Sequence, residues 1–168
     1  GLSIEEAKIV SSMIQKYLEE QTRLRIPVLL SEECPHGHQA IDSTTTPVNF
    51  LSGCSWDTDI YQQIQEIVGQ EIKEKGAHLG LISTLDVMRD PRWGRSEECF
   101  SEDPYLTSQF TAAAVKGLQK QEASFPQIGA VIKHLAGQGN SMGGHNAAAV
   151  HIGKRELLEI HLPAVETA

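Results

Sequence analysis

Four stretches of the chain carry apolar residues at the spacing of an amphipathic helix. Ser3 and Glu6 form a capping-box pattern at the start of the first stretch. Asp103 and Pro104 suit the cap and first turn of the third. The predicted helices run from the Ser3 cap to about Thr22–Leu24, from Ser55 or Asp57 to Gly76, from Pro104 to about Gln119, and from Arg155 to His161.

Three short apolar runs lie between these helices and predict buried strands. They cover residues 26–30, 79–85 and 128–132, and the first contains Pro27, which fits a strand's first residues better than its middle. The resulting order is helix, strand, helix, strand, helix, strand, helix. This alternation predicts an α/β fold with a parallel sheet and crossover helices.

A polar loop follows each predicted strand. The loops cover 31–53, 86–103 and, rich in glycine, 137–144. The carboxyl ends of parallel strands carry the functional groups in barrels and doubly wound sheets. The candidate chemistry of this chain is therefore expected in these three loops.

Composition excludes several classes of protein. The 168 residues carry a net charge of −8 and no run of Lys and Arg, which argues against nucleic acid as a partner. No apolar stretch approaches the ~20 residues of a membrane span, and the first residues lack a signal-peptide pattern. The cysteines, Cys34, Cys54 and Cys99, are odd in number and widely spaced, which favours reduced thiols in a cytoplasmic protein.

The first loop contains two carboxylates and two histidines within eight residues, including Glu33, His36 and His38. These residues are compatible with a metal site, with a turn around a buried histidine, or with sugar binding through a carboxylate that accepts from neighbouring hydroxyls. A His-x-His pair without a clustered third ligand is a weak metal signal, so we expect no metal or other cofactor.

Arginines and carboxylates alternate through the second loop and its flank, from Asp86 to Asp103. Some of these charges are expected to pair with each other, and an arginine fork also suits adjacent hydroxyls. Lys133 and His134 end the third strand, where a half-buried ammonium requires a partner. The glycines after them do not match Gly-x-Gly-x-x-Gly or a P-loop, which argues against a nucleotide site.

Taken in order, these loops resemble family 3 glycoside hydrolases. The resemblance is carried by Arg25–Gly37, by Ser55-Trp56-Asp57, by Asp90-Pro91-Arg92-Trp93-Gly94-Arg95 with the acidic stretch behind it, by Lys133-His134 with Gly137, and by Arg155-Glu156-Leu157 with His161-Leu162-Pro163. It covers nearly the whole chain, and the Asp90–Arg95 segment is its most specific part.

The resemblance implies that residues 1–168 are a fragment, roughly half, of a TIM-type (β/α)8 barrel, which typically needs ~250 residues. It also implies a retaining mechanism on terminal β-linked glucosides or xylosides. Carried over by position, Glu33, Arg95, Lys133 and His134 bind the innermost sugar. The family often has Asp at the position of Glu33, so the longer side chain is expected to alter sugar preference.

Retaining hydrolysis needs a nucleophile and an acid/base carboxyl. By the resemblance both belong to later elements, so we expect no catalytic residue in this chain and no hydrolysis by it alone. One alternative is a non-catalytic sugar-binding module. Another is the branch of the family that removes N-acetylglucosamine, which Lys133–Gly139 matches poorly. A half barrel exposes a sheet edge, so self-association is also expected.

Overall fold

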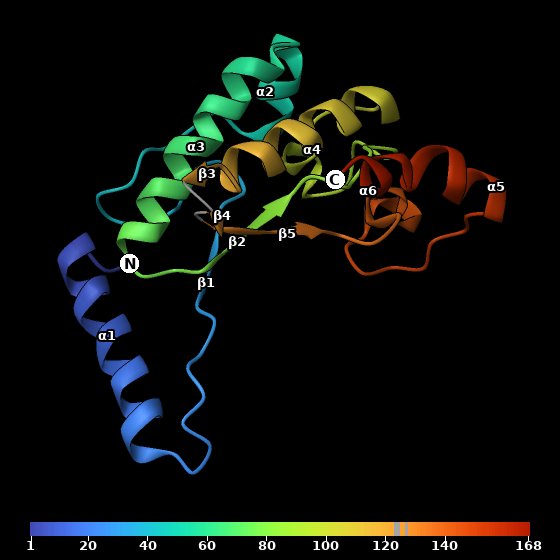
Figure 1. Ribbon diagram of the computed structural model, residues 1–168. Coiled ribbons are helices and arrows are strands. Elements are labelled where there is room, and N and C mark those ends of the chain that lie inside the picture. The colour runs from blue at the N-terminus through green and yellow to red at the C-terminus, as the bar shows by residue number, and fades with distance from the viewer. Residues whose placement is uncertain (123–124, 127) are drawn as a thin grey trace.

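The centre of the computed structural model is a sheet of three parallel strands (Figure 1). The structure describes residues 1–122, 125–126 and 128–168. Strands β1 (Ser31–Glu33), β2 (Leu79–Ser83) and β5 (Gly129–Lys133) lie in the order β1-β2-β5. Leu79 is in register with both Ser31 and Gly129. The predicted parallel sheet is confirmed.

The three long helices are also confirmed, with their caps. They are α1 (Ile4–Gln21), α3 (Thr58–Glu74) and α4 (Pro104–Leu118). The Asp57 carboxylate accepts from the Ile60 amide at 2.9 Å, and that of Asp103 from the Leu106 amide at 2.7 Å. Each cap satisfies an amide that has no partner inside its helix.

Two predictions for the region between α1 and α3 are wrong. Residues 26–30 form no strand, and β1 begins just after them at Ser31. The backbone of Val28 bonds instead to the side chain of Gln15, which both donates to its carbonyl and accepts from its amide. The predicted loop also contains a helix, α2 (Asn49–Ser55).

Short elements complete the described chain. They are η1 (Ser96–Glu98), β3 (Gln121–Glu122), β4 (Phe125–Pro126), η2 (Gln138–Asn140), η3 (Met142–Gly144), α5 (Lys154–Glu156), η4 (Leu157–His161) and α6 (Pro163–Thr167). The fourth predicted helix is thus split into α5 and a π-helical turn, η4, which precede α6.

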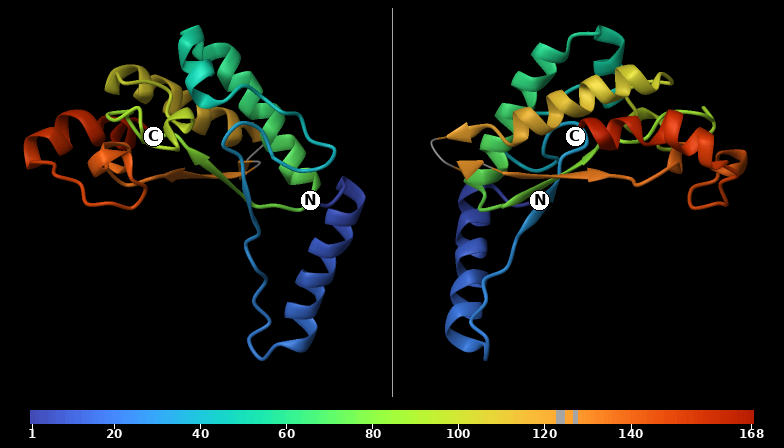
Figure 2. Two further views of the ribbon diagram at one scale, coloured as in Figure 1. Left: turned by 180° about the vertical axis from the view of Figure 1, so that it is seen from behind. Right: turned by 45° about the vertical axis from the view of Figure 1, so that its right-hand side comes forward.

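The hydrophobic core lies between the sheet and the pair α3 and α4, which run over one face of it (Figures 1 and 2). Its aromatic centre is formed by Tyr61 of α3, Phe110 of α4 and Phe100. Their ring centroids lie 4.9–5.3 Å apart, with Tyr61 edge-on to both phenylalanines. Such pairs add ~0.5–1.5 kcal/mol beyond the area they bury, so this centre fixes the two helices above the strand ends.

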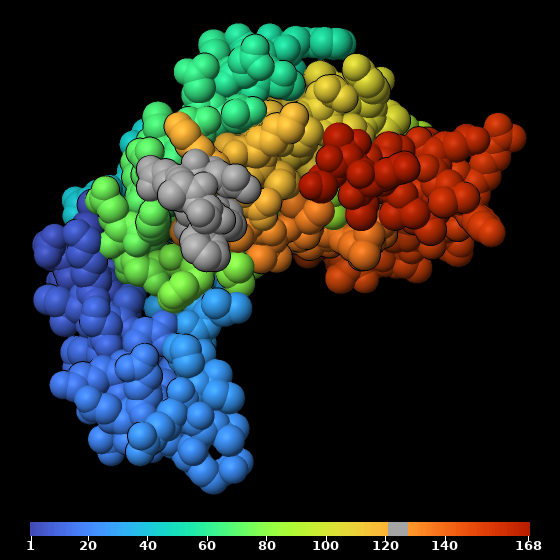
Figure 3. All heavy atoms as spheres, viewed as in Figure 1, coloured from blue at the N-terminus to red at the C-terminus, as the bar shows by residue number. Residues whose placement is uncertain are grey.

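Helix α1 and the segment that returns from it to β1 project away from this body (Figures 1 and 3). No residue of α1 is buried, and two of its apolar side chains, Met13 and Tyr17, are more than 60% exposed. Among the described residues, no helix has the length and apolar character needed to cross a membrane.

The three free cysteines differ sharply in accessibility, which gives a first testable prediction. Cys54 is exposed, whereas Cys34 and Cys99 are buried. Burial raises the pKa of the Cys34 thiol to about 12 and raises that of Cys99 as well. Because thiolate is the reactive species, we expect one fast equivalent with Ellman's reagent and three after denaturation. Cys54→Ser should remove the fast phase; a fast phase that persists in this variant would contradict the buried placement of the other two thiols.

Candidate functional site

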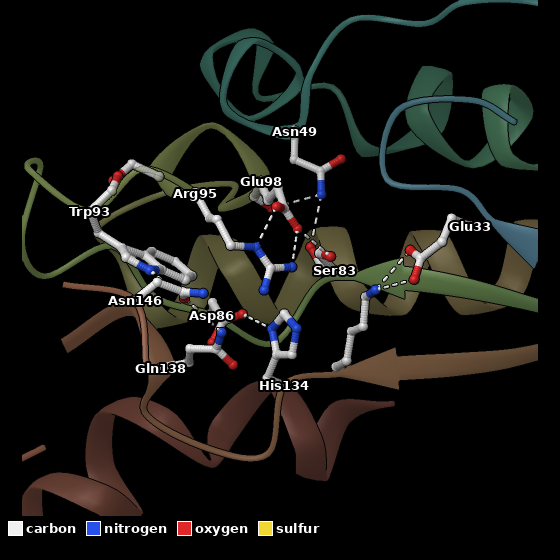
Figure 4. Close-up of polar contacts among 12 residues, drawn as sticks. Glu33, Asn49, Ser83, Asp86, Trp93, Arg95, Glu98, His134, Gln138 and Asn146 are labelled. Carbon is white, nitrogen blue, oxygen red and sulfur yellow. Dashed lines mark hydrogen bonds and ion pairs between the residues drawn. The ribbon is translucent and has the colours of Figure 1, made fainter. Parts of the chain in front are cut away.

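Charged side chains gather where the three strands end (Figure 4). Glu33 is the last residue of β1, Ser83 of β2 and Lys133 of β5. The strands are parallel, so these ends meet at one edge of the sheet. The structure thus brings the first predicted loop to the end of the third predicted strand, although 100 residues separate Glu33 from Lys133 in the sequence.

Glu33 and Lys133 form an ion pair across this edge. The Lys133 ammonium donates to both carboxylate oxygens of Glu33, each at 2.7 Å. The lysine side chain is 20% exposed and the glutamate 56%, so water reaches the pair. Glu33 is therefore the partner that a half-buried Lys133 was expected to require. Both groups remain accessible to a ligand, one as donor and one as acceptor.

Arg95 lies beside this pair and is held by Glu98. Its Nε and Nη2 donate to the two carboxylate oxygens of Glu98 at 2.6 and 2.7 Å. Burial raises the pKa of the Glu98 carboxyl, but hydrogen bonds from Arg95 and from the Ser83 hydroxyl at 2.7 Å outweigh it and lower that pKa overall. The carboxylate therefore stays ionised and fixes the plane of the guanidinium.

The Arg95–Glu98 pair is fastened to the scaffold through Asn49 at the start of α2. The buried amide of Asn49 donates to the carbonyls of Ser83 and Glu98, each at 2.8 Å. Its oxygen accepts from the Tyr61 hydroxyl, which also accepts from Gln65 of α3. A chain of buried hydrogen bonds thus connects the core to the strand end that carries the site.

His134 follows Lys133 and contacts a second carboxylate, Asp86. The Nδ1 atom of His134 lies 2.7 Å from Oδ2 of Asp86, whose side chain is 1% exposed. Burial raises the pKa of the Asp86 carboxyl, and the bond from His134 partly opposes this rise. The Arg95 guanidinium also acts on Asp86 through space.

The Asp90–Arg95 segment is held against the third loop by a buried tryptophan. The indole NH of Trp93 donates to Asn146 at 3.1 Å, and Arg95 lies over the Trp93 ring, 5.8 Å from its centroid. A side chain at Gly139 would lie 2.4 Å from the Val87 carbonyl oxygen. Glycine at this position thus allows the second and third loops to approach closely. Arg95 is held by the Glu98 carboxylate and by the Trp93 ring.

Two carboxylates of the second loop pair with its arginines, as the sequence predicts for this stretch. Asp90 binds Arg92 through two side-chain hydrogen bonds of 2.6 and 2.9 Å, which lower the pKa of its carboxyl to about 2. Glu98 binds Arg95, as described above. Asp103, at the end of this loop, caps α4, as the sequence predicts.

The histidines of the first loop do not share one site. His38 is buried between Glu32 and Ser43, with both contacts at 3.1 Å. His36 contacts Gln39 instead. Among the described residues, no three His, Cys, Asp or Glu side chains form a group that could bind a metal ion. The interpretation of this loop as a turn around a buried histidine agrees with the position of His38.

Sequence reasoning missed two residues of the site, Asp86 and Asn49. Asp86 comes just after β2, and the rule that selected Lys133 and His134 at the end of β5 applies to it equally. Asn49 had no local signal in the sequence. Its partners are the backbone carbonyls of Ser83 and Glu98, which lie 34 and 49 positions further along the chain.

Comparison with known proteins agrees with this architecture. Residues 3–168 match the glycosyl hydrolase family 3 N-terminal domain. A protein of Formosa agariphila named for β-xylosidase activity is 37% identical over 158 residues, which cover 92% of this chain and 21% of that protein. A solved β-glucosidase from Erythrobacter marinus superposes with a TM-score of 0.90 at 34% identity, covering 98% of this chain and 22% of that one.

A second solved structure, the β-glucosidase of Listeria innocua in complex with isofagomine, gives a TM-score of 0.88 at 32% identity, covering 96% of this chain and 22% of that one. This chain thus spans about a fifth of the length of the relatives it matches. Its three parallel strands and their helices correspond to part of the barrel domain of these enzymes. The chain belongs to glycosyl hydrolase family 3, as a portion of the N-terminal domain.

Proposed function

We propose that this chain supplies the sugar-binding side of the innermost subsite in a retaining β-glycosidase that acts on terminal β-linked glucosides or xylosides. The observation that carries the proposal is the convergence of Glu33, Arg95 and Lys133 at one sheet edge, with His134 beside them (Figure 4). Vicinal hydroxyls of a pyranose both donate and accept, and charged partners make the stronger hydrogen bonds.

The names of the relatives support the same substrate class. The solved relatives from Listeria innocua include complexes with laminaribiose and with glucose, and the Formosa agariphila relative is named for xyloside cleavage. Glu33 reaches one methylene further than the aspartate that the resemblance leads us to expect. The longer side chain leaves less room beside it, so we expect it to change the relative affinity for xylose and glucose.

The catalytic pair is proposed to lie outside this sequence. Each carboxylate of the site already has a cationic or imidazole partner: Glu33 binds Lys133, Glu98 binds Arg95 and Asp86 binds His134. This arrangement suits positioning of a sugar better than attack on an anomeric carbon, which needs two carboxyl groups about 5 Å apart flanking the scissile bond.

Calorimetric titration of the chain with D-glucose, D-xylose and N-acetylglucosamine tests the proposal. We expect heat of binding with glucose or xylose and no release of nitrophenol from aryl β-glucosides or β-xylosides. Binding of neither sugar would contradict the proposed subsite. Nitrophenol release would contradict the placement of the catalytic pair, and preference for N-acetylglucosamine would favour the other branch of the family.

A further inference from the structure

Asp86 is the most deeply buried charged group of the site. It follows β2, is 2% exposed, and its partner through Oδ2 is His134. Its other oxygen, Oδ1, is buried without a donor among the described residues. A buried carboxylate is costly unless it is paired, so the bond to His134 is the main compensation that this group receives.

The bond determines which nitrogen of His134 stays available. A carboxylate only accepts, so an ionised Asp86 selects the ring form in which Nδ1 carries the proton and donates to it. The Nε2 atom makes no hydrogen bond to the described residues, and the side chain is 23% exposed. The ring lies beside Asp86 and below the guanidinium of Arg95 in the view of Figure 4.

We propose that Asp86 is a positioning residue, which locks the His134 ring with Nδ1 as the donor and thereby presents Nε2 to a sugar hydroxyl. The inference rests on the proposed function for the identity of the ligand. It adds a role for a residue that touches no sugar itself. Carboxylates behind an imidazole fix ring orientation and tautomer in this way at other sites, where they hold ligating histidines.

The charges around His134 are consistent with this role. Lys133 precedes it on β5, while Arg95 and Glu98 face the site from the second loop and act through space on Asp86 and His134, respectively. Both flanking pairs, Lys133 with Glu33 and Arg95 with Glu98, are compensated internally. Asp86 is therefore the carboxylate that remains for His134. A sugar hydroxyl matches either charge state of the ring, since it accepts from a protonated Nε2 and donates to a neutral one.

The test compares the wild-type chain with Asp86→Asn by ¹⁵N NMR of the histidine ring, recorded without sugar. We expect a protonated Nδ1 at His134 in the wild type, and loss of that preference in the variant, whose amide can donate to Nδ1. Titration with glucose and xylose should then show about 10-fold to 100-fold weaker binding in Asp86→Asn, the value of one charged hydrogen bond. Asp86→Glu keeps the acceptor and should recover part of the preference for protonated Nδ1.

Asp103→Asn is the matched control, because it removes the carboxylate that caps α4 and has no contact with the site. The new amide oxygen can still accept from the helix amide, so the variant should fold and leave the state of the His134 ring unchanged. An unchanged ring state in a folded Asp86→Asn would overturn the inference, as would a neutral wild-type ring protonated at Nε2. The wild-type spectrum is decisive even if the variant does not fold. If the wild type binds neither sugar, the proposed function fails, while the ring measurement still decides the role of Asp86.

Discussion

Gly53→Ala is expected to destabilise the chain by about 4 kcal/mol or more, a large fraction of the roughly 5–15 kcal/mol that stabilises a typical domain. A Cβ at this position would lie 1.9 Å from the carbonyl oxygen of Phe100 and 2.8 Å from its carbonyl carbon. Both are backbone atoms, so no side-chain rotation relieves the clash. In most helices the same change stabilises by ~1 kcal/mol, so even the sign of the effect tests the packing of α2.

The consequence for the site is direct, because α2 begins at Asn49 and Gly53 lies one turn further along it. Movement of the helix away from Phe100 would carry Asn49 away from Ser83 and Glu98. The measurement is urea unfolding followed by circular dichroism. Gly94→Ala is the matched control, since no atom lies within 4 Å of its added Cβ. It should stay within about 0.5 kcal/mol of the wild type. Equal stability of the two variants would refute the close approach of α2 to Phe100.

Local signals predicted those elements whose stability is local. The capping box at Ser3, the cap at Asp57 and the Asp103-Pro104 start each satisfy backbone groups within their own helix, so the sequence near each cap contains the whole signal. Strands β2 and β5 were found because they are apolar runs between such helices. Their alternation with helices predicted that both belong to a parallel sheet.

Elements that depend on distant contacts were missed. Helix α2 has no side-chain cap at Val48, and it contains a glycine and two serines, a composition typical of a loop. It forms where Gly53 lets it pack on Phe100. The apolar run 26–30 resembled a strand, yet a strand requires a neighbour. In the part of the chain that the structure describes, Val28 bonds to the Gln15 side chain, and Leu30, at the end of the run, bonds to residue 78 and to the first residue of β2.

The site follows the same division. The charge-rich loops and their positions after strands were predicted from sequence, and the structure places Glu33, Arg95, Lys133 and His134 at the same end of the sheet. The carboxylate behind His134 was harder to assign, because Asp86 acquires its partner only when the end of β5 and the second loop meet. Sugar binding by the four residues stays a prediction.

Lys133→Met is expected to weaken binding of glucose or xylose by about 100-fold, while the free energy of unfolding changes by no more than about 1 kcal/mol. The ammonium is 20% exposed and its partner Glu33 is 56% exposed, so water screens the pair and its contribution to stability is small. A bound sugar displaces that water, and the charged donor then contributes far more to affinity than it did to stability. Calorimetric titration and urea unfolding measure the two effects separately.

Lys120→Met is the matched control for this prediction. Its ammonium donates to Glu66 at 2.7 Å, the same distance as in the site pair, and joins the end of α4 to α3. It should change stability by a similar small amount and leave affinity unaltered. Equal sugar affinity in the two lysine variants would show that Lys133 makes no contact with the ligand.

Glu33→Gln combined with Lys133→Met completes the cycle and tests whether the two residues act as one unit. Each single variant leaves its partner without a counter-charge at the sheet edge, so part of its loss in affinity comes from that unpaired group. The double variant removes both charges, so its loss should be smaller than the sum of the two single losses. Strict additivity would mean that Glu33 and Lys133 contact the sugar independently. A shortfall of 1 kcal/mol or more, about 5-fold in affinity, would mean that the ion pair itself presents the hydroxyl-binding surface.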